Sequence, residues 1–567
     1  MTPIMAGFLS SQVASFLIVP VVSCILYSQW AYKKRSQGLP LPPGPKGWPV
    51  IGNVFDVPLA GMALVYAQWA KSFGSDIVSA SVLGDTIVFI DSYDTAIELL
   101  EKRASKYSSR PRLVMSCEVL GWDCIFAFNP YSEMWRERRR LFVKYFRSPG
   151  HSDATSGTAV HTSQVHEFVH RFLLDVNETP GDAYELVRRM IGSLAISLAY
   201  GLPVQRKGDE LVEFVDSVAR LFLHFLTPGN AIVDVIPSLN YIPESIPIPF
   251  TNIGIPVPGM GWKRYGKSVQ WMAVKFKMEG YERAVKGFGT ESVRPSFTSY
   301  SLASLDATSP TEEARLKGVD AIQDAAATIF GTAADTTTSA VLTHIFALAT
   351  HPDVRKTIQA ELDSLLVEED NFGKRTLRLP TLEDQDKLPI LTAAVMESQR
   401  WVPVAPIGVP HRTTEDDVYK GYFIPKGSVV IANQWSMLNN KEEYGEDVLE
   451  FNPDRFIRTK TGSEGARIEI NPNIRHPATI AFGFGRRICP GSHIAQSTLW
   501  LTAASLLTLF DFELPTGERP NYVGSDGKVD KRFDPGFLCR PKELKCEFKV
   551  RSEEARALLA QLAISSG

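Results

Sequence analysis

The chain has 567 residues, and its 60 lysines and arginines nearly balance its 63 aspartates and glutamates, leaving a formal net charge of −3. There is no basic excess to indicate a nucleic-acid partner, and we expect none. Its six cysteines are scattered without the paired spacing of metal ligands, and Cys117 and Cys124, which could be half of a zinc site, have no second pair of that kind. We therefore expect reduced thiols in a protein that faces the cytosol, not a disulfide scaffold.

The first 32 residues predict a membrane anchor. No charged side chain occurs between Thr2 and Tyr32, and VASFLIVPVVSCILYSQWAY supplies about 20 largely apolar residues, enough for a helix to cross a bilayer. The basic run Lys33-Lys34-Arg35 follows directly, and positive flanks stay on the cytoplasmic side. A cleaved signal peptide, the alternative, would carry its positive charge before the apolar run.

Residues 33–53 predict a basic and proline-rich hinge. The stretch LPLPPGPKGWPVIGN contains five prolines and three glycines, so it cannot form a helix or a central strand. The rest of the sequence contains no second linker of this kind, no internal repeat and no long low-complexity tract. We therefore expect residues 54–567 to form one large domain.

Helical periodicity dominates this domain. It predicts helices at residues 63–73, 92–102, 130–146, 321–350, 353–368, 391–401 and 494–509. Alternating stretches at residues 77–90 and 427–433 predict strands. Residues 292–310, rich in serine and threonine, and residues 241–262, apolar and punctuated by prolines, are expected to be loops. The expected fold class is mainly α with small β-sheets.

One aromatic and one basic side chain lie at helical spacing within WRERRR. Trp135 and Arg139 are four residues apart and point to the same side of a helix, so an indole N–H and a guanidinium can converge on one anion. Arg136 and Arg138 are expected on the solvated side of this helix.

A single carboxylate interrupts the apolar helix predicted at residues 321–350. Asp335 lies within AAATIFGTAADTTTSAV, where an ionised side chain is costly unless it has a partner. Threonine hydroxyls, such as that of Thr336, can bond back to carbonyls four residues earlier and bend the helix, and small neighbours leave room there for a small ligand. A helix N-cap or a solvated acidic position is the alternative for Asp335.

Glu397 and Arg400 lie three residues apart on one face of a predicted helix, and Arg455 follows in the turn FNPDRF. Such pairs are common on solvated helices, so the spacing alone indicates nothing. A carboxylate between two arginines would form a strong, directional network with a structural role.

The sequence FGFGRRICPG, at positions 482–491, surrounds one cysteine with three glycines, a proline and two arginines. Glycine permits backbone conformations and close approaches that a Cβ forbids. The arginines and the start of the next helix make the potential at Cys489 positive, which favours thiolate over thiol. The loop is therefore built around a reactive sulfur.

In this order, the motifs WRxxR, AADTT, ExxR, PDRF and FGFGRRICPG resemble those of the cytochrome P-450 superfamily of haem-thiolate monooxygenases. The hinge and the ICPG ending are similar to those of fungal microsomal members, and the resemblance extends to about Phe537. It implies the cytochrome P-450 fold with an N-terminal transmembrane helix, and haem b with Cys489 as the axial thiolate ligand of its iron. The family's motif positions imply further cofactor-binding residues: Phe482, Gly485, Arg487, Gly491, Trp135, Arg139 and Arg412.

The resemblance also assigns Asp335 and Thr336 to the acid–alcohol pair that supplies protons during oxygen activation, and Glu397, Arg400 and Arg455 to a structural triad. It implies electrons from NADPH through a separate NADPH–cytochrome P-450 reductase, with cytochrome b5 as a second candidate donor, because the chain has no FMN- or NAD-binding fingerprint. The protein would be a single-pass protein of the endoplasmic reticulum membrane, with its catalytic domain facing the cytosol.

The expected reaction inserts one atom of O2 into an apolar small molecule by hydroxylation or epoxidation, as in the secondary metabolism of terpenoid, steroid or aromatic skeletons. By the family's topology, the pocket would be lined by residues 113–128, parts of 221–250, 327–335, 402–409 and 533–538, and residues 241–262 would dip into the bilayer. Departures from the family are Ala333, where glycine is frequent, and an apparent insertion at residues 246–258. Two alternatives are a haem-thiolate isomerase or dehydratase, which usually lacks the acid–threonine pair, and a non-catalytic haem-binding protein.

Overall fold

The computed structural model describes residues 27, 30–58, 60–146, 157–179, 183–227, 229–247, 254–290, 293–308, 311–462, 465–514, 521–524 and 526–566. The anchor predicted at residues 1–32 lies almost entirely outside these residues, so it stays a prediction. Within the described part of the chain, no helix is both long enough and apolar enough to cross a membrane. A mainly helical fold with small sheets, as predicted, is confirmed.

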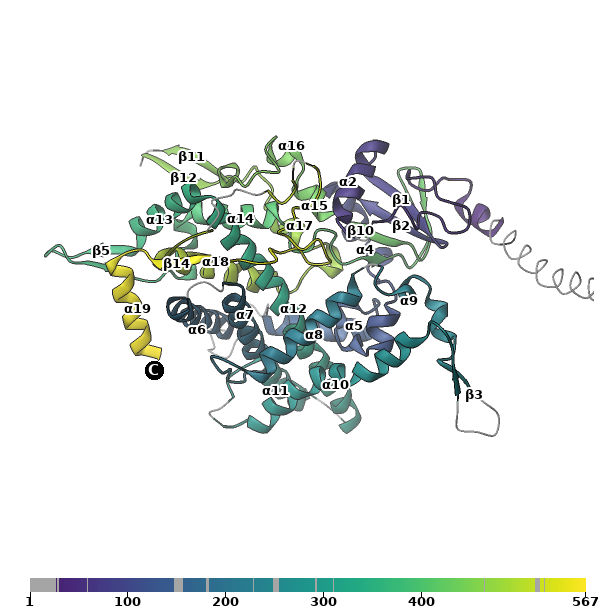
Figure 1. Cartoon of the computed structure of the whole chain (residues 1–567), viewed down its shortest axis with the longest axis horizontal. Helices are drawn as coiled ribbons and strands as arrows, with labels where there is room; N and C mark the ends of the chain where they lie inside the picture. The colour runs from purple at the N-terminus through teal and green to yellow at the C-terminus, as the bar shows by residue number, and fades with distance from the viewer. Residues whose placement is uncertain are drawn as a thin grey trace, which may run out of the picture.

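Helices make up most of the fold (Figure 1). The longer ones are α2 (Met62–Phe73), α5 (Glu133–Phe146), α6 (Gly157–Glu178), α7 (Ala183–Tyr200), α8 (Glu210–Leu226), α10 (Gly261–Gly287), α11 (Phe297–Thr308), α12 (Glu312–Thr350), α13 (Pro352–Leu366), α14 (Pro389–Trp401), α18 (Ser492–Leu509) and α19 (Glu553–Ser566). The shorter α-helices are α3 (Tyr93–Ala96), α4 (Ala104–Tyr107), α9 (Ile232–Val235), α15 (Gln434–Leu438), α16 (Lys441–Tyr444) and α17 (Ala478–Ala481). Short π- and 3-10 helices are η1 (Ile97–Lys102), η2 (Val114–Val119), η3 (Trp122–Cys124), η4 (Phe126–Phe128), η5 (Pro237–Tyr241), η6 (Leu382–Lys387), η7 (Pro453–Phe456) and η8 (Gly485–Arg487). Every helix that periodicity predicts is present, and the one at residues 92–102 is α3 continued by η1.

One four-stranded sheet joins the two halves of the chain. It contains β1 (Ile77–Val82), β2 (Asp85–Ile90), β10 (Val429–Ala432) and β7 (His411–Arg412), in that order. Strands β2 and β10 are parallel, with Val88 opposite Val430, and the other two pairings are antiparallel. Both predicted strand regions belong to this sheet. Two-stranded sheets are formed by β3 (Ser245–Pro247) with β4 (Gly254–Pro256), β5 (Val367–Glu369) with β6 (Arg375–Leu377), β8 (Asp417–Tyr419) with β9 (Tyr422–Ile424), β11 (Ile457–Gly462) with β12 (Gly465–Ile470), and β13 (Phe510–Glu513) with β14 (Glu547–Val550).

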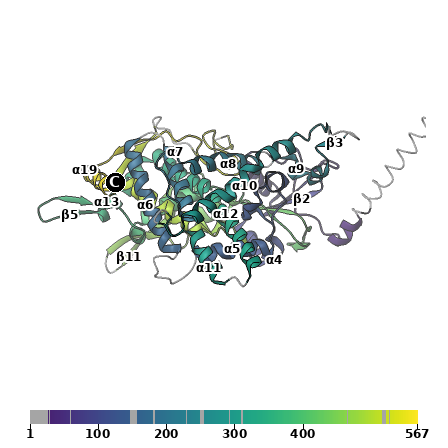
Figure 2. The ribbon, with the colours of Figure 1, turned by 90° about the horizontal axis from the view of Figure 1, so that it is seen from below.

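Helix α12 runs through the middle of the molecule (Figures 1 and 2). All of its side chains from Ala321 to Phe330 are buried, and α5, α7, α10, α14 and α18 pack around it. A helix that is buried on every side lies in the interior of a large domain. Any polar group that α12 carries in this stretch is therefore shielded from bulk water.

Two local predictions are wrong. Residues 292–310, expected to be a loop, contain α11, because Phe297 and Leu302 are buried in the main core and their burial offsets the weak helix propensity of serine and threonine. Arg138, expected at the surface, is buried, and its guanidinium donates to Asp324 (2.7 Å) and Asp320 (2.8 Å) of α12. Arg138 can be buried because two carboxylates of α12 neutralise its charge.

Candidate active site

The cysteine loop is closed by its own backbone. The amide of Cys489 donates to the carbonyl of Phe482 (2.8 Å), and Cys489 itself is half-buried. Gly485 has a φ of 56°, and a Cβ there would lie 2.1 Å from the carbonyl oxygen of Leu100, so only glycine lets the loop pack on η1. Gly491 is the N-cap of α18, which places Cys489 just before a helix N-terminus.

Helix α5 lies along this loop. Arg139 donates through Nη2 to the carbonyl of Ile488, the residue before Cys489 (2.6 Å). The guanidinium of Arg487 stacks over the indole of Trp135, with 4.2 Å between its carbon and the ring centroid. The structure thus brings Trp135 and Arg139 together with the loop, on the same side of α5.

Cations gather beside the loop without acidic partners. Arg487 and Arg110 are both buried, and they donate to backbone carbonyls, among them those of Ser108 and Val409 (2.7 Å each). In the described part of the chain, no carboxylate pairs with either guanidinium. Burial and the charge of Arg139 lower the pKa of Arg487 to about 9, and burial and Arg487 lower the pKa of Arg110 well below its usual range.

Strand β7 adds two further basic side chains. His411 is buried and donates through Nδ1 to the carbonyl of Tyr107 (2.8 Å), and its pKa is lowered by burial and by Arg110. Arg412 donates through Nε to the carbonyl of Gly427 (3.1 Å). The sequence indicated Arg412 but missed His411 and Arg110, because neither lies in a recognisable motif and only β7 pairing brings their segments together.

The predicted acid and alcohol on α12 have different partners. Thr336 donates through Oγ1 to the carbonyl of Thr332 (2.8 Å), the backbone bonding that the sequence predicts for these threonines. Asp335 is buried, and its Oδ1 accepts a hydrogen bond from Nη1 of Arg540 (3.2 Å). The structure therefore does not join Asp335 to Thr336 directly.

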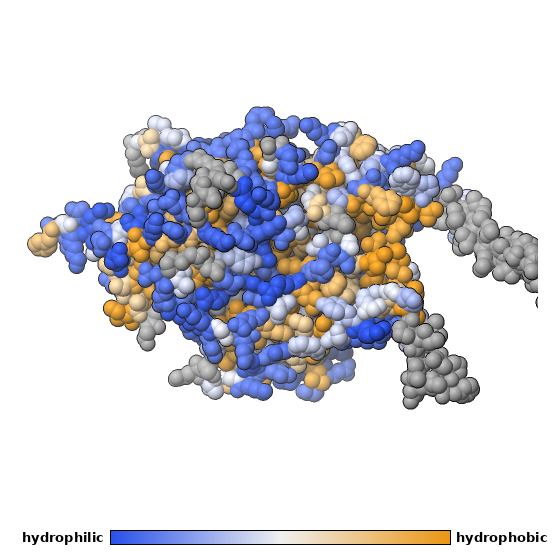
Figure 3. All heavy atoms as spheres, viewed as in Figure 1, coloured by the Kyte–Doolittle hydropathy of each residue, from blue (hydrophilic) through white to orange (hydrophobic). Residues whose placement is uncertain are grey.

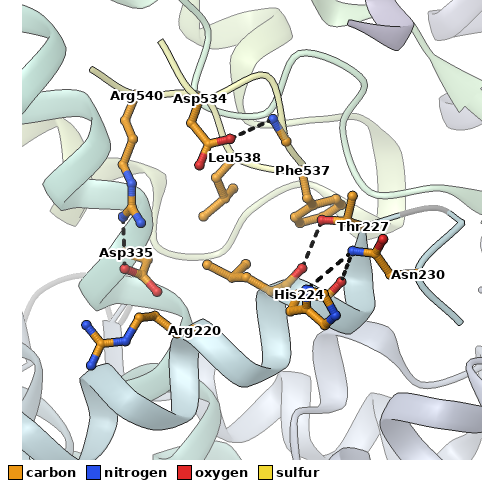
Figure 4. Close-up of a pocket in the computed structure, with 11 residues that line it drawn as sticks. Arg220, His224, Thr227, Asn230, Asp335, Asp534, Phe537, Leu538 and Arg540 are labelled. Carbon is orange, nitrogen blue, oxygen red and sulfur yellow. Dashed lines mark hydrogen bonds and ion pairs between the residues drawn. The ribbon is translucent and has the colours of Figure 1, made fainter. Parts of the chain in front are cut away.

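Asp335 and Arg540 line a cavity of about 220 Å³ between α8, α12 and the segment at residues 534–540 (Figure 4). Its lining also includes Arg220, Leu223, His224, Thr227, Asn230, Asp534, Gly536, Phe537 and Leu538. Three of the five segments expected to form the substrate pocket contribute to it, namely residues 221–250, 327–335 and 533–538. The cavity combines apolar side chains with charged groups of both signs.

The predicted triad forms one buried network. Arg400 donates two hydrogen bonds to Glu397 (2.7 and 2.8 Å), and Nε of Arg455 donates to the same carboxylate (3.1 Å). The side chains of Glu397 and Arg400 are fully buried. Arg400 also donates to the carbonyl of Val448 (2.7 Å), so the network ties α14 to the chain before η7.

A family model described as cytochrome P-450 matches residues 42–547. The chain belongs to the cytochrome P-450 family. It is 35% identical over 542 residues to cytochrome P-450 monooxygenase ple1 of Rhodocybe pseudopiperita, covering 96% of this chain and 95% of that protein. It is 35% identical over 544 residues to cytochrome P-450 monooxygenase 208 of Postia placenta (95% of each chain), and 33% identical over 554 residues to tryptamine 4-monooxygenase of Psilocybe cyanescens (95% and 98%). The predicted family and the enzyme class, a cytochrome P-450 monooxygenase, are confirmed.

The residues beside Cys489 fit the haem that the cytochrome P-450 family implies. Nη1 of Arg487 is buried and has no hydrogen-bond partner among the described residues, and a buried guanidinium without an anion is costly. A propionate of a haem would supply the acceptor that Nη1 of Arg487 lacks, and Arg110 would add a second buried positive charge. At Gly491 a Cβ would meet only Phe142, at 3.9 Å, so the protein itself leaves space there.

Proposed function

We propose that this protein is a membrane-anchored monooxygenase that inserts one atom of O2 into an apolar small molecule, with electrons from NADPH through a separate reductase. The observation that best supports it is the pair of buried guanidiniums, Arg110 and Arg487, beside the Cys489 loop, where Nη1 of Arg487 has no partner among the described residues. Cys489 would be the axial ligand of haem b, and Arg139, Arg412 and the indole of Trp135 would help to seat it. When bound, the haem supplies the activation of O2 and the transfer of one oxygen atom.

The chain's own side chains would orient the cysteine loop, transfer protons and exclude water. Arg139 holds the carbonyl of Ile488 and thereby orients the loop that presents Cys489. The Asp335 carboxylate would take protons from the cavity and pass them toward the Thr336 hydroxyl, which the backbone of α12 holds in place. Apolar side chains such as Phe537 and Leu538 would exclude water around a bound substrate.

The surface supports a membrane orientation. Residues 30–36, the β1–β2 hairpin and the β3–β4 hairpin lie at one end of the molecule (Figures 1 and 2), and Figure 3 shows apolar surface gathered at that end. Large exposed apolar side chains on the segments there are Trp48, Val50, Phe55, Leu83, Ile232 and Tyr241. Monomeric soluble proteins rarely expose apolar patches of this kind. An anchor at residues 1–32, a hinge at 33–53 and a catalytic domain at 54–567 would place this face on the endoplasmic reticulum bilayer. Within the apolar loop, residues 248–253 lie outside the described residues.

The haem ligand can be tested directly. The reduced protein with carbon monoxide should show the red-shifted Soret band of a thiolate-ligated haem. Cys489→Ser should abolish that band, whereas Cys117→Ser, at another half-buried cysteine, should leave it unchanged. An unchanged band in Cys489→Ser would overturn the assignment. Product that appears only with reductase, NADPH and O2 would distinguish a monooxygenase from an isomerase or dehydratase.

A further inference from the structure

A threonine of α12 binds a neighbouring loop through its hydroxyl. Thr332 and Thr336 each donate to the carbonyl four residues earlier, as hydroxyls inside helices commonly do. Oγ1 of Thr328 instead donates to the carbonyl of Cys124 (3.2 Å) and accepts from the amide of Phe126 (3.1 Å). Thr328 is 4% exposed, and a buried backbone group that loses its hydrogen bond is costly.

This hydroxyl bridge joins two short helices of one loop to α12. Cys124 ends η3 and Phe126 begins η4, so a single side chain holds the connection between them. Thr328 precedes Asp335 by seven residues, which places both on one face of α12, about 10 Å apart along its axis. The bridge therefore fixes the loop on the side of α12 that carries Asp335.

Aromatic side chains at both ends of the loop contact segments that are expected to surround the substrate. Trp122, in η3, packs against Phe222 of α8, with 5.8 Å between the ring centroids. Phe128, in η4, packs against the same ring (5.3 Å) and lies 6.4 Å from the ring of Phe537. Thr328 thus holds the backbone between the two aromatic anchors of the loop.

We propose that Thr328 is a positioning residue that sets the selectivity of the substrate pocket for bulky ligands, by fixing an aromatic wall formed by Trp122, Phe128 and Phe222; this rests on the function proposed above. The bridge keeps residues 122–128 in the conformation that a bulky ligand contacts, so binding does not have to order the loop. A ligand too small to reach the wall gains nothing from the bridge. Loss of the hydroxyl therefore weakens the binding of bulky ligands selectively.

Two ligands of ferric haem distinguish these cases, because both shift the Soret band. 4-Phenylimidazole carries a bulky apolar ring, whereas imidazole occupies little more than the position at the iron. Thr328→Val keeps the shape of the side chain and removes both hydrogen bonds, so the Kd of 4-phenylimidazole should rise about tenfold while that of imidazole stays unchanged. Thr328→Ser keeps the hydroxyl and should retain the natural ratio of the two Kd values.

Hydrogen–deuterium exchange tests the bridge without any ligand. The amide of Phe126 loses its acceptor in Thr328→Val, so exchange in peptides that cover residues 122–129 should be about tenfold faster than in the natural protein. Thr328→Ala should show the same acceleration, which separates the loss of the hydroxyl from the methyl group that valine adds. Unchanged exchange in both variants would overturn the bridge.

Thr343→Val is the matched control. Thr343 also lies on α12 and is 1% exposed, but its hydroxyl has no hydrogen-bond partner among the described residues, so this variant should change neither Kd nor exchange. The proposal would be overturned by an unchanged Kd of 4-phenylimidazole in Thr328→Val, by equal changes for both ligands, or by a Thr328→Ser protein that behaves like Thr328→Val. Failure of the proposed function is recognisable separately, because the ferrous–CO band of a thiolate-ligated haem would then be absent.

Discussion

Arg110 and Arg112 lie two residues apart, yet their surroundings differ completely. Arg112 is exposed and donates to Glu118 (2.8 Å) on the surface. Arg110 is buried, donates to the carbonyls of Val409 and Pro410 (2.7 and 2.9 Å), and has its pKa lowered by burial first and by Arg487 second. Arg110 is therefore a buried cation held by backbone carbonyls, whereas Arg112 forms an ion pair at the surface.

At the residue scale, Arg110→Gln should weaken haem binding, because it removes one buried cation from the site proposed for the propionates. A hydrogen bond to a charged group contributes about 1.5–3 kcal/mol, so we expect haem loss to excess apomyoglobin to be about tenfold to a hundredfold faster. Arg112→Gln is the matched control and should lose haem at the natural rate. Equal rates in the two variants would show that Arg110 does not contact the cofactor.

At the scale of elements, single carboxylates hold separate segments together. Glu397 of α14 accepts from Arg400, from Arg455 and from the amide of Asn452 (2.9 Å). Asp234 of α9 accepts from the amide of Met115 in η2 (2.7 Å), which connects two segments expected to border the substrate channel. Hydrophobic periodicity predicts individual elements, but it does not predict these contacts between them.

Glu397→Gln should destabilise the fold, because it leaves the buried guanidinium of Arg400 without its anion and leaves Arg455 with Asp447 alone. Removal of one partner from a buried ion pair costs about 3–5 kcal/mol. The midpoint of urea unfolding should therefore fall clearly below that of Glu442→Gln, a control at an exposed glutamate of α16. Coincident midpoints for the two variants would mean that the network contributes little stability.

Asp234→Asn should change how stability depends on pH. Burial raises the pKa of Asp234 to about 6, above its ordinary value near 4. Between pH 4 and pH 6 the Asp234 carboxyl is more often protonated in the folded protein than in the unfolded chain. Its contribution to the free energy of unfolding therefore becomes more favourable as the pH falls from 6 to 4. Unfolding measured from pH 7 to pH 4 should show a steeper loss of stability in Asp234→Asn than in the exposed control Asp85→Asn. Parallel curves would contradict the shifted pKa.

At the scale of the whole molecule, the two ends differ in their surfaces. One end presents the apolar side chains of residues 48–55, the β1–β2 turn and α9, while β5, β6 and α19 project from the other (Figures 1 and 2). The side chains of Phe372, at the turn between β5 and β6, and Ile564, in α19, are exposed singly at that far end. The exposed apolar side chains at the first end lie on the same side of the molecule as residues 30–36, the described residues that follow the predicted anchor.

A protein lacking residues 1–32 should still bind liposomes through this end. Four large apolar side chains contribute on the order of 6–12 kcal/mol before ordering costs, at about 1.5–3 kcal/mol each. Serine at Trp48, Phe55, Ile232 and Tyr241 should release the shortened protein in a flotation assay, whereas serine at Phe372 and Ile564 should not. If the shortened protein with its natural residues floats free of vesicles, the apolar end does not contact the bilayer.

Local patterns in the sequence were enough for the seven predicted helices, for strands β1, β2 and β10 and for the family, but not for α11, whose segment was expected to be a loop. Hydrophobic periodicity and secondary-structure propensity depend on neighbouring residues alone. Helix α12 and the β1–β2 hairpin can therefore be recognised in the sequence without knowing which elements pack against them. The order of short motifs around Trp135, Asp335, Glu397 and Cys489 likewise identified the cytochrome P-450 family before any contact was known.

The partners of buried charges were decided only by the tertiary structure. Arg110 meets Val409 from 299 residues away, and Arg540 meets Asp335 from 205 residues away. Arg138 shows the same effect, since only the packing of α5 against α12 supplies its carboxylates. The free energy of a charge depends on the water it loses and the partners it gains, and both are set by distant segments that no local pattern of residues specifies.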